Sequence, residues 1–183
     1  MIHTAQPIDQ LPRTMAEFAD WEPNDGFKYE WNNGELIKFI GMKQQQWYVY
    51  EMLNTLFIEK DYYKLGTLMA EPDVMLTGIQ MRRPDIAYFT REQIRQGKAN
   101  QEYIIPAFVI EVISTNDQII PVRNKLNEYF KAGVSVVWLV FADEQAVEIY
   151  TSRRDVKICL ENDICSASPV LPEFEISVSE LLG

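Results

Sequence analysis

The strongest constraint on the fold is a succession of three segments between residues 107 and 141. Residues 107–114 have the apolar pattern of a buried strand. Residues 121–132 predict a helix, because a proline stands in the first turn and Gly133 follows the last. Residues 134–141, VSVVWLVF, predict a second strand. A strand that reaches the next strand through a helix favours a parallel crossover within one sheet.

The segments before this unit predict a hairpin, a helix and further strands. Residues 27–40, FKYEWNNGELIKFI, predict a hairpin that turns at Asn33-Gly34, where a two-residue turn needs positive φ angles. Residues 43–60 repeat apolar side chains at i, i+3, i+4, i+7 and i+8, which predicts an amphipathic helix. Extended segments are expected near 66–77, bent at a proline, and near 83–89.

After residue 141, QAVEIYTSRRDVKICL predicts a second hairpin and SVSELLG a closing turn of helix. The expected core order is α-β-β-β-α-β, with a hairpin at each end. Short links favour antiparallel pairing and the crossover favours parallel pairing, so the fold class is α/β or α+β, a mixed β-sheet flanked by helices.

Length and hydropathy limit the organisation of the chain. With 183 residues and 47% apolar content, residues 1–183 are expected to form one domain, with residues 1–13 as a mobile tail. The apolar runs are much shorter than the roughly 20 residues of a membrane span, and the N-terminus has no apolar signal-like region. We therefore expect a cytoplasmic protein that does not contact membranes.

Histidine and cysteine usage excludes several chemistries. The only histidine is His3, so Ser-His-Asp hydrolysis, Cys-His proteolysis and histidine-ligated zinc lack their central residue. Cys159 and Cys165 are too few for a disulfide framework and are expected to be reduced structural thiols. The glycines are scattered singly, so there is no glycine-rich phosphate loop.

The formal charge of −10 is concentrated at the two ends of the chain. Residues 1–35 hold seven acids against two bases, and residues 158–183 hold five acids and no base, which leaves the middle neutral. Within that middle, a locally basic stretch is expected to contact nucleic-acid phosphates, helped by one more arginine; an ordinary solvated face is the alternative. These residues are Arg82, Arg83, Arg91, Arg95 and Lys98, with Arg123.

One carboxylate, Glu111, interrupts an apolar strand. Side-chain alternation places it on the same face as Val109 and Ile113. Asp85 begins the preceding strand, so the two acids converge if those strands pair. Carboxylates about 4 Å apart repel by roughly 4 kcal/mol at an effective dielectric near 20. A divalent cation such as Mg²⁺ removes that repulsion. The alternatives are that Pro84-Asp85 only starts a strand and that Glu111 pairs with a buried base.

The chain resembles a known family of nucleases. Pro84-Asp85, Glu111-Val112 and the element order are similar to the PD-(D/E)XK phosphodiesterase superfamily, which has the restriction-endonuclease-like fold. Five segments resemble the Uma-two endonuclease family from about Thr14 onward: YEWNNGELI, RRPDIAYFT, PAFVIEVIS, KLNEYFKAGVSVVWLV and SPVLPEFEISVSELL. The resemblance implies a homodimeric endonuclease that hydrolyses phosphodiester bonds of nucleic acid, with DNA as the expected substrate and Mg²⁺ or Mn²⁺ as cofactor.

The resemblance also assigns residues. It makes Asp85 and Glu111 catalytic metal ligands, together with the backbone carbonyl of Val112. Isoleucine 113 occupies the position of the superfamily lysine, and Lys125 in NKLNEY is the matching candidate on the next helix. A solvent-facing lysine is the alternative. Glu30 aligns with an acidic family position and is expected to orient water in the site, unless it is an exposed hairpin residue.

Two departures from the family pattern leave other functions open. Gln44 to Gln46 stand where the family commonly has a histidine, and Phe141 stands where it commonly has an acid. Neither change removes a metal ligand, but both leave room for an altered substrate or reduced activity. The alternatives are an inactive nuclease-fold module that binds nucleic acid or protein, and a structural homodimer domain. The sequence does not distinguish DNA from RNA or reveal a sequence preference.

Overall fold

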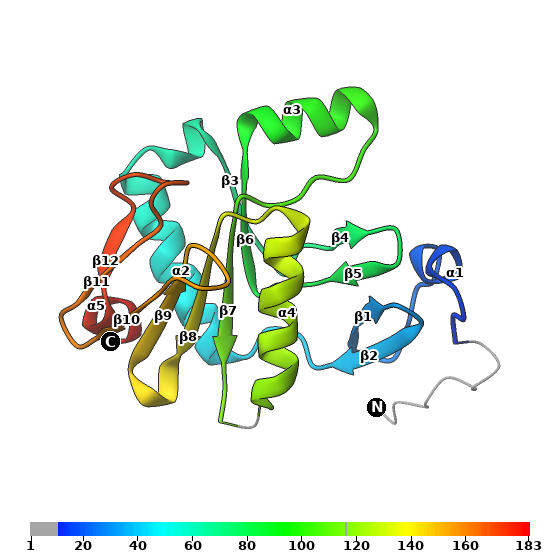
Figure 1. The fold of residues 1–183 in the computed structure, drawn as a ribbon, viewed down its shortest axis with the longest axis horizontal. Coiled ribbons are helices and arrows are strands. Elements are labelled where there is room, and N and C mark those ends of the chain that lie inside the picture. The colour runs from blue at the N-terminus through cyan, green and yellow to red at the C-terminus, as the bar shows by residue number, and fades with distance from the viewer. Residues whose placement is uncertain (1–10, 116) are drawn as a thin grey trace.

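The structure is a computed structural model that describes residues 11–115 and 117–183 (Figure 1). His3 and most of the predicted tail, residues 1–13, lie outside the described residues. Within the described part of the chain, none of the helices is long and apolar enough to cross a membrane.

A six-stranded sheet forms the centre of the molecule, with strand order β10-β9-β8-β7-β6-β3. Only β7 and β8 run parallel, and helix α4 (Ile119–Ala132) connects them. The other neighbours pair antiparallel. The predicted mixed sheet is confirmed. Its strands are β3 (Gly66–Ala70), β6 (Ile86–Thr90), β7 (Phe108–Ile113), β8 (Val136–Phe141), β9 (Ala146–Tyr150) and β10 (Val156–Leu160).

Helices cover both faces of this sheet. Val122, Leu126 and Tyr129 of α4 pack on the face that includes Val109 of β7. Helix α2 (Gln44–Glu59), with α5 (Val178–Leu182) and the small pair β11 (Ile164–Ser166) and β12 (Glu175–Ser177), covers the face that includes Ile110. Successive side chains of β7 point to opposite faces of the sheet, so this strand contributes to two separate cores. Burying each large apolar side chain contributes about 1.5–3 kcal/mol to the free energy of unfolding.

A second sheet of four strands, in the order β2-β1-β5-β4, lies beside the central one (Figure 1). Its strands are β1 (Lys28–Asn32), β2 (Glu35–Phe39), β4 (Val74–Thr77) and β5 (Gln80–Arg82), and the short helix α1 (Met15–Ala19) adds Phe18 to its core. Asn33 and Gly34 have φ angles of 48° and 92°, which confirms the predicted hairpin turn.

The prediction of a single bent strand for residues 66–77 is wrong. The chain instead forms β3 and β4, which belong to different sheets. Glu71 takes a positive φ of 46°, and Pro72 has no N–H to donate to a strand partner. These two residues end β3 and redirect the chain into the second sheet.

The sequence pattern also missed helix α3 (Arg91–Asn100), which contains most of the basic stretch. Thr90 caps this helix by accepting from the backbone N–H of Gln93, and the Gln93 side chain accepts from the backbone N–H of Thr90. This capping box was readable in the sequence. Two short 3₁₀ turns, Tyr62–Lys64 and Ala142–Glu144, complete the local structure.

The C-terminal predictions are confirmed. Gly133 ends α4 with a φ of 106°, a conformation that glycine adopts without steric cost. Strands β9 and β10 form the second hairpin. Cys159 and Cys165 are free and fully buried, as expected for structural thiols.

Candidate active site

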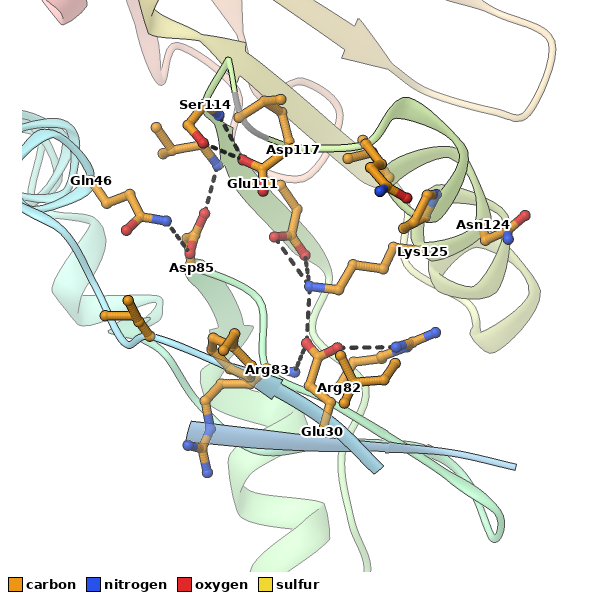
Figure 2. Close-up of a pocket in the computed structure, with 18 of the residues that line it drawn as sticks. Glu30, Gln46, Arg82, Arg83, Asp85, Glu111, Ser114, Asp117, Asn124 and Lys125 are labelled. Atoms are coloured by element: carbon orange, nitrogen blue, oxygen red, sulfur yellow. Dashed lines mark hydrogen bonds and ion pairs between the residues drawn. The ribbon is translucent and has the colours of Figure 1, made fainter. Parts of the chain in front are cut away.

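The register between β6 and β7 brings Asp85 and Glu111 together. Ile86 pairs with Ile110 in this antiparallel ladder, so Asp85, one position before β6, lies across from Glu111. Figure 2 shows both carboxylates in one pocket, at the end of the sheet where β7 leads into α4. The strand pairing on which their convergence depends is therefore present.

Asp85 is held by two donors. The backbone N–H of Val112 donates to Oδ2 at 2.7 Å, and Nε2 of Gln46 donates to Oδ1 at 2.8 Å. Burial and the charge of Glu111 raise the pKa of Asp85 to about 7. Val112 thus contacts the site through its amide, and its carbonyl remains a predicted ligand.

Glu111 is 6% exposed and also has two donors. The hydroxyl of Tyr129 donates to Oε1 at 2.5 Å, and Nζ of Lys125 donates to the same oxygen at 3.2 Å. Burial raises the pKa of Glu111, although the charge of Lys125 opposes this. The basic partner considered for Glu111 exists, and it is the lysine that the family resemblance selects.

Lys125 reaches from α4 into the pocket and bridges two carboxylates. Its Nζ lies 2.9 Å from Oε1 of Glu30 and 3.2 Å from Oε1 of Glu111, and its side chain is 22% exposed. The alternative of a solvent-facing lysine is wrong. Burial lowers the pKa of Lys125, but the charges of Glu111 and Glu30 outweigh this and raise the pKa. Lys125 is therefore an ammonium at neutral pH.

Glu30 connects the second sheet to this site. It is 2% exposed and lies on β1, so the alternative of an exposed hairpin residue is wrong. Its Oε1 also accepts from the backbone N–H of Arg83 at 2.9 Å, and its Oε2 accepts from the guanidinium of Arg82 at 3.0 Å. Burial raises the pKa of Glu30, but the charge of Lys125 leads the effects that lower it overall. Glu30 is therefore a buried anion that fixes Lys125.

The pocket around these residues has a volume of about 520 Å³. Its rim comes from the start of α2, the end of β7 and the first turns of α4, including Lys43, Gln45, Ser114 and Gln118. Among the described residues, no group of three or more His, Cys, Asp or Glu side chains is placed to hold a metal ion. Asp85 and Glu111 nevertheless fit Mg²⁺ or Mn²⁺, because one or two carboxylates with water complete such a site.

The predicted phosphate-binding residues lie in different places. Arg82 is buried between Glu30 and Glu128, and Arg83 lines the pocket while its guanidinium pairs with Asp73. The three basic residues of α3 lie at the end of the sheet opposite the β7–α4 connection (Figure 1). These are Arg91, which donates to the carbonyl of Tyr63, Arg95, which pairs with Glu92, and Lys98. Arg123 is exposed on α4 and does not line the pocket.

From the sequence, no positioning role was assigned to two residues that contact the acids. Gln46 lies in the first turn of α2, where its side-chain oxygen accepts from the backbone N–H of Lys43 while its amide donates to Asp85. No local signal selects it from the neighbouring glutamines. Tyr129 follows Lys125 by four positions, which places both on one face of α4. That spacing was a usable signal.

Replacing Tyr129 with phenylalanine is expected to lower the free energy of unfolding by about 1–2 kcal/mol, because a hydrogen bond to a buried carboxylate is lost. Urea unfolding of the metal-free protein measures this effect. Tyr103→Phe, which removes a hydroxyl from a side chain that is 71% exposed, is the matched control and should change little. Equal effects of the two substitutions would contradict a stabilising contact between Tyr129 and Glu111.

Comparison with known proteins agrees with the predicted family and fold. The family model Uma2, described as "Putative restriction endonuclease", matches residues 15–179. No curated protein matches the chain significantly. Among solved structures, a protein from Anabaena variabilis ATCC 29413, described as "a putative nuclease belonging to DUF820", is similar with a TM-score of 0.73. It is 22% identical, over 93% of this chain and 98% of that chain, so this likeness shows the fold. The predicted fold and family are confirmed, and the chain belongs to the Uma2 family of restriction-endonuclease-like proteins.

Proposed function

We propose that this protein is a metal-dependent endonuclease that hydrolyses phosphodiester bonds of nucleic acid, with DNA as the expected substrate. One observation carries the proposal: Asp85 and Glu111 share a pocket in which Lys125 is fixed as an ammonium. Two acids and a cation meet the needs of phosphodiester hydrolysis, which are a held divalent ion and a donor to the phosphoryl oxygens.

Each residue has a distinct role in this proposal. Asp85 and Glu111 hold the divalent cation, with the carbonyl of Val112 as a further ligand. Bound there, Mg²⁺ or Mn²⁺ supplies Lewis acidity to the phosphoryl group and lowers the pKa of the attacking water. Gln46 and Tyr129 fix the directions of the two carboxylates, because each donates a hydrogen bond to one of them.

Lys125 acts by charge and hydrogen bonding. An ammonium has three N–H donors, and Glu30 and Glu111 accept from two of them. The third donor is available to an oxygen of the phosphate. Because its carboxylate neighbours raise its pKa, Lys125 carries a positive charge and acts as a hydrogen-bond donor. Its expected role is therefore to position the phosphate and stabilise negative charge in the transition state.

Arg83 is the predicted phosphate contact that lines the cavity without being buried between carboxylates, but its guanidinium points away from Lys125 (Figure 2) and pairs with the exposed Asp73. Arg82 has a different role, because its guanidinium is buried between two carboxylates. The residues of α3 would contact only a nucleic acid that extends to the far end of the sheet. We therefore place the scissile phosphate beside Lys125, with Arg83 as a contact for the flanking backbone.

One observation favours the inactive module as a second candidate. Lys125 already neutralises part of the charge on Glu30 and Glu111, so these two acids have a cationic partner within the protein. Incubation of the purified protein with single-stranded, double-stranded and forked nucleic acids, with Mg²⁺, Mn²⁺ or EDTA, distinguishes the two. The proposal expects cleavage with a divalent ion and none with EDTA. Binding without cleavage under every condition would support the inactive module.

Metal binding has a consequence for stability that does not depend on cleavage. Mn²⁺ at about 100 times its Kd should stabilise the folded protein by about 2.7 kcal/mol, because only the folded state has the site. Thermal unfolding with and without Mn²⁺ measures the change in Tm. Glu111→Gln should abolish the change, while Asp61→Asn, an exposed aspartate paired with Lys64, should retain it. A full change in Tm with Glu111→Gln would remove Glu111 from the metal site.

A further inference from the structure

Two exposed aromatic side chains lie at the start of α2. Trp47 is 51% exposed and Tyr48 is 53% exposed, with their ring centroids 5.1 Å apart. The buried face of the same helix consists of Val49, Leu53 and Phe57. Packing of α2 on the sheet therefore does not account for the two exposed rings. We call Trp47 and Tyr48 the aromatic surface.

The aromatic surface adjoins the candidate active site. Lys43, Gln45 and Gln46 line the pocket at the first turn of α2. The backbone N–H of Trp47 donates to the carbonyl of Lys43 at 3.0 Å, and Tyr48 lies three positions after Gln45 on the same face of the helix. The rings are therefore within one helical turn of residues that line the pocket.

The polar neighbours of the rings suit a nucleic-acid strand. Lys43 is exposed and lines the pocket, so it supplies a cation at the end of α2 that carries the two rings. Gln44 donates through Nε2 to the hydroxyl of Tyr48 at 2.6 Å, which restrains that ring. A cation together with exposed aromatic rings is the combination that binds single strands, because each base has a face that can stack.

We propose that the aromatic surface stacks unpaired bases next to the scissile phosphate, so that the substrate is single-stranded or forked nucleic acid. This inference rests on the proposed function and names the substrate class of the same site. The faces of bases inside a duplex are already covered by neighbouring bases. Only bases that have left a duplex can therefore stack on Trp47 and Tyr48.

Binding in EDTA tests the inference without cleavage. The probe is a fluorescent oligothymidylate of about 12 nucleotides, alone or annealed to its complement, at low salt. The parent protein should bind the single strand more tightly than the duplex. The double variant Trp47→Ala with Tyr48→Ala should weaken single-strand binding about tenfold or more and leave duplex binding within about twofold. Its fold is checked by circular dichroism.

Two variants sharpen the test. Trp47→Phe with Tyr48→Phe keeps an aromatic face at both positions and should bind the single strand within about threefold of the parent. Tyr103→Ala removes an exposed ring that lines a different hollow, and it should bind like the parent. A Tyr103→Ala protein as weak as the double alanine variant would overturn the assignment to the start of α2.

Two outcomes overturn the inference: unchanged single-strand binding by the double alanine variant, and an equal loss for strand and duplex. If unchanged binding comes with a change of oligomeric state in sedimentation, the aromatic surface is a contact between copies of the chain. If the double alanine variant loses single-strand binding and the parent protein cleaves no substrate, the inference stands and the proposed function is refuted. If the parent protein cleaves and the double alanine variant binds the single strand as the parent does, the proposed function stands and the inference is refuted.

Discussion

Cleavage by the Asp85→Asn protein is expected to fall about 10³-fold or more at fixed Mg²⁺ or Mn²⁺, because the substitution removes one of two charges that hold the cation. The remaining amide oxygen can still accept from the backbone N–H of Val112, so the strand pairing should persist. Initial rates on the best substrate measure the effect. Asp61→Asn is the control and should cleave like the parent. Cleavage by Asp85→Asn at the parent rate would exclude Asp85 as a ligand.

The same substitution changes the pH dependence of stability. Burial and the charge of Glu111 raise the pKa of Asp85 from 3.8 to about 7 in the folded protein. Between these values the folded state keeps a proton that the unfolded state has lost, so the free energy of unfolding falls as the pH rises. In the metal-free protein, Asp85→Asn should therefore raise Tm more at pH 8 than at pH 5. An equal change at both values would contradict the raised pKa.

Lys125→Ala is expected to lower cleavage by about 10²-fold or more, which is the usual effect of removing one positioned, charge-stabilising donor. Lys131→Ala, in the last turn of the same helix, is the matched control and should retain the parent rate. Lys125 also bridges Glu30 and Glu111, so its removal leaves two buried carboxylates without their shared partner. The variant should therefore be less stable as well as slower.

A second substitution separates these two effects. Glu30→Gln removes one of the two negative charges that Lys125 bridges; Arg82 keeps Glu128 as a partner, and the glutamine oxygen can still accept from Arg83. In the Lys125→Ala background it should restore part of the free energy of unfolding and leave cleavage slow. Recovery of both properties would show that Lys125 acts only through stability. Cleavage within about threefold of the parent by Lys125→Ala alone would show that the chemistry does not need the lysine.

Local signals in the sequence were sufficient for most of the architecture. The Asn33-Gly34 turn, the glycine after α4 and the apolar periods of α2 and β7 depend only on residues a few positions apart. The pairing of β6 with β7 was only a condition in the sequence analysis, because the connection between these strands contains α3; the register of the sheet supplies it and brings Asp85 and Glu111 together. The capping box of α3 is also a local signal. The helix was not predicted because only the charge of this segment was considered.

The sequence by itself determined which side chains line the two faces of each strand and which residues resemble a nuclease site. Only the tertiary structure decided that Lys125 bridges Glu30 and Glu111, because these residues lie on three elements whose separation depends on how two sheets and α4 pack. It also placed α3 at the far end of the sheet and gave Asp85 its contact with Gln46. Propensity and periodicity act over one or two turns, whereas the energy of a buried charge depends on all of its neighbours in space.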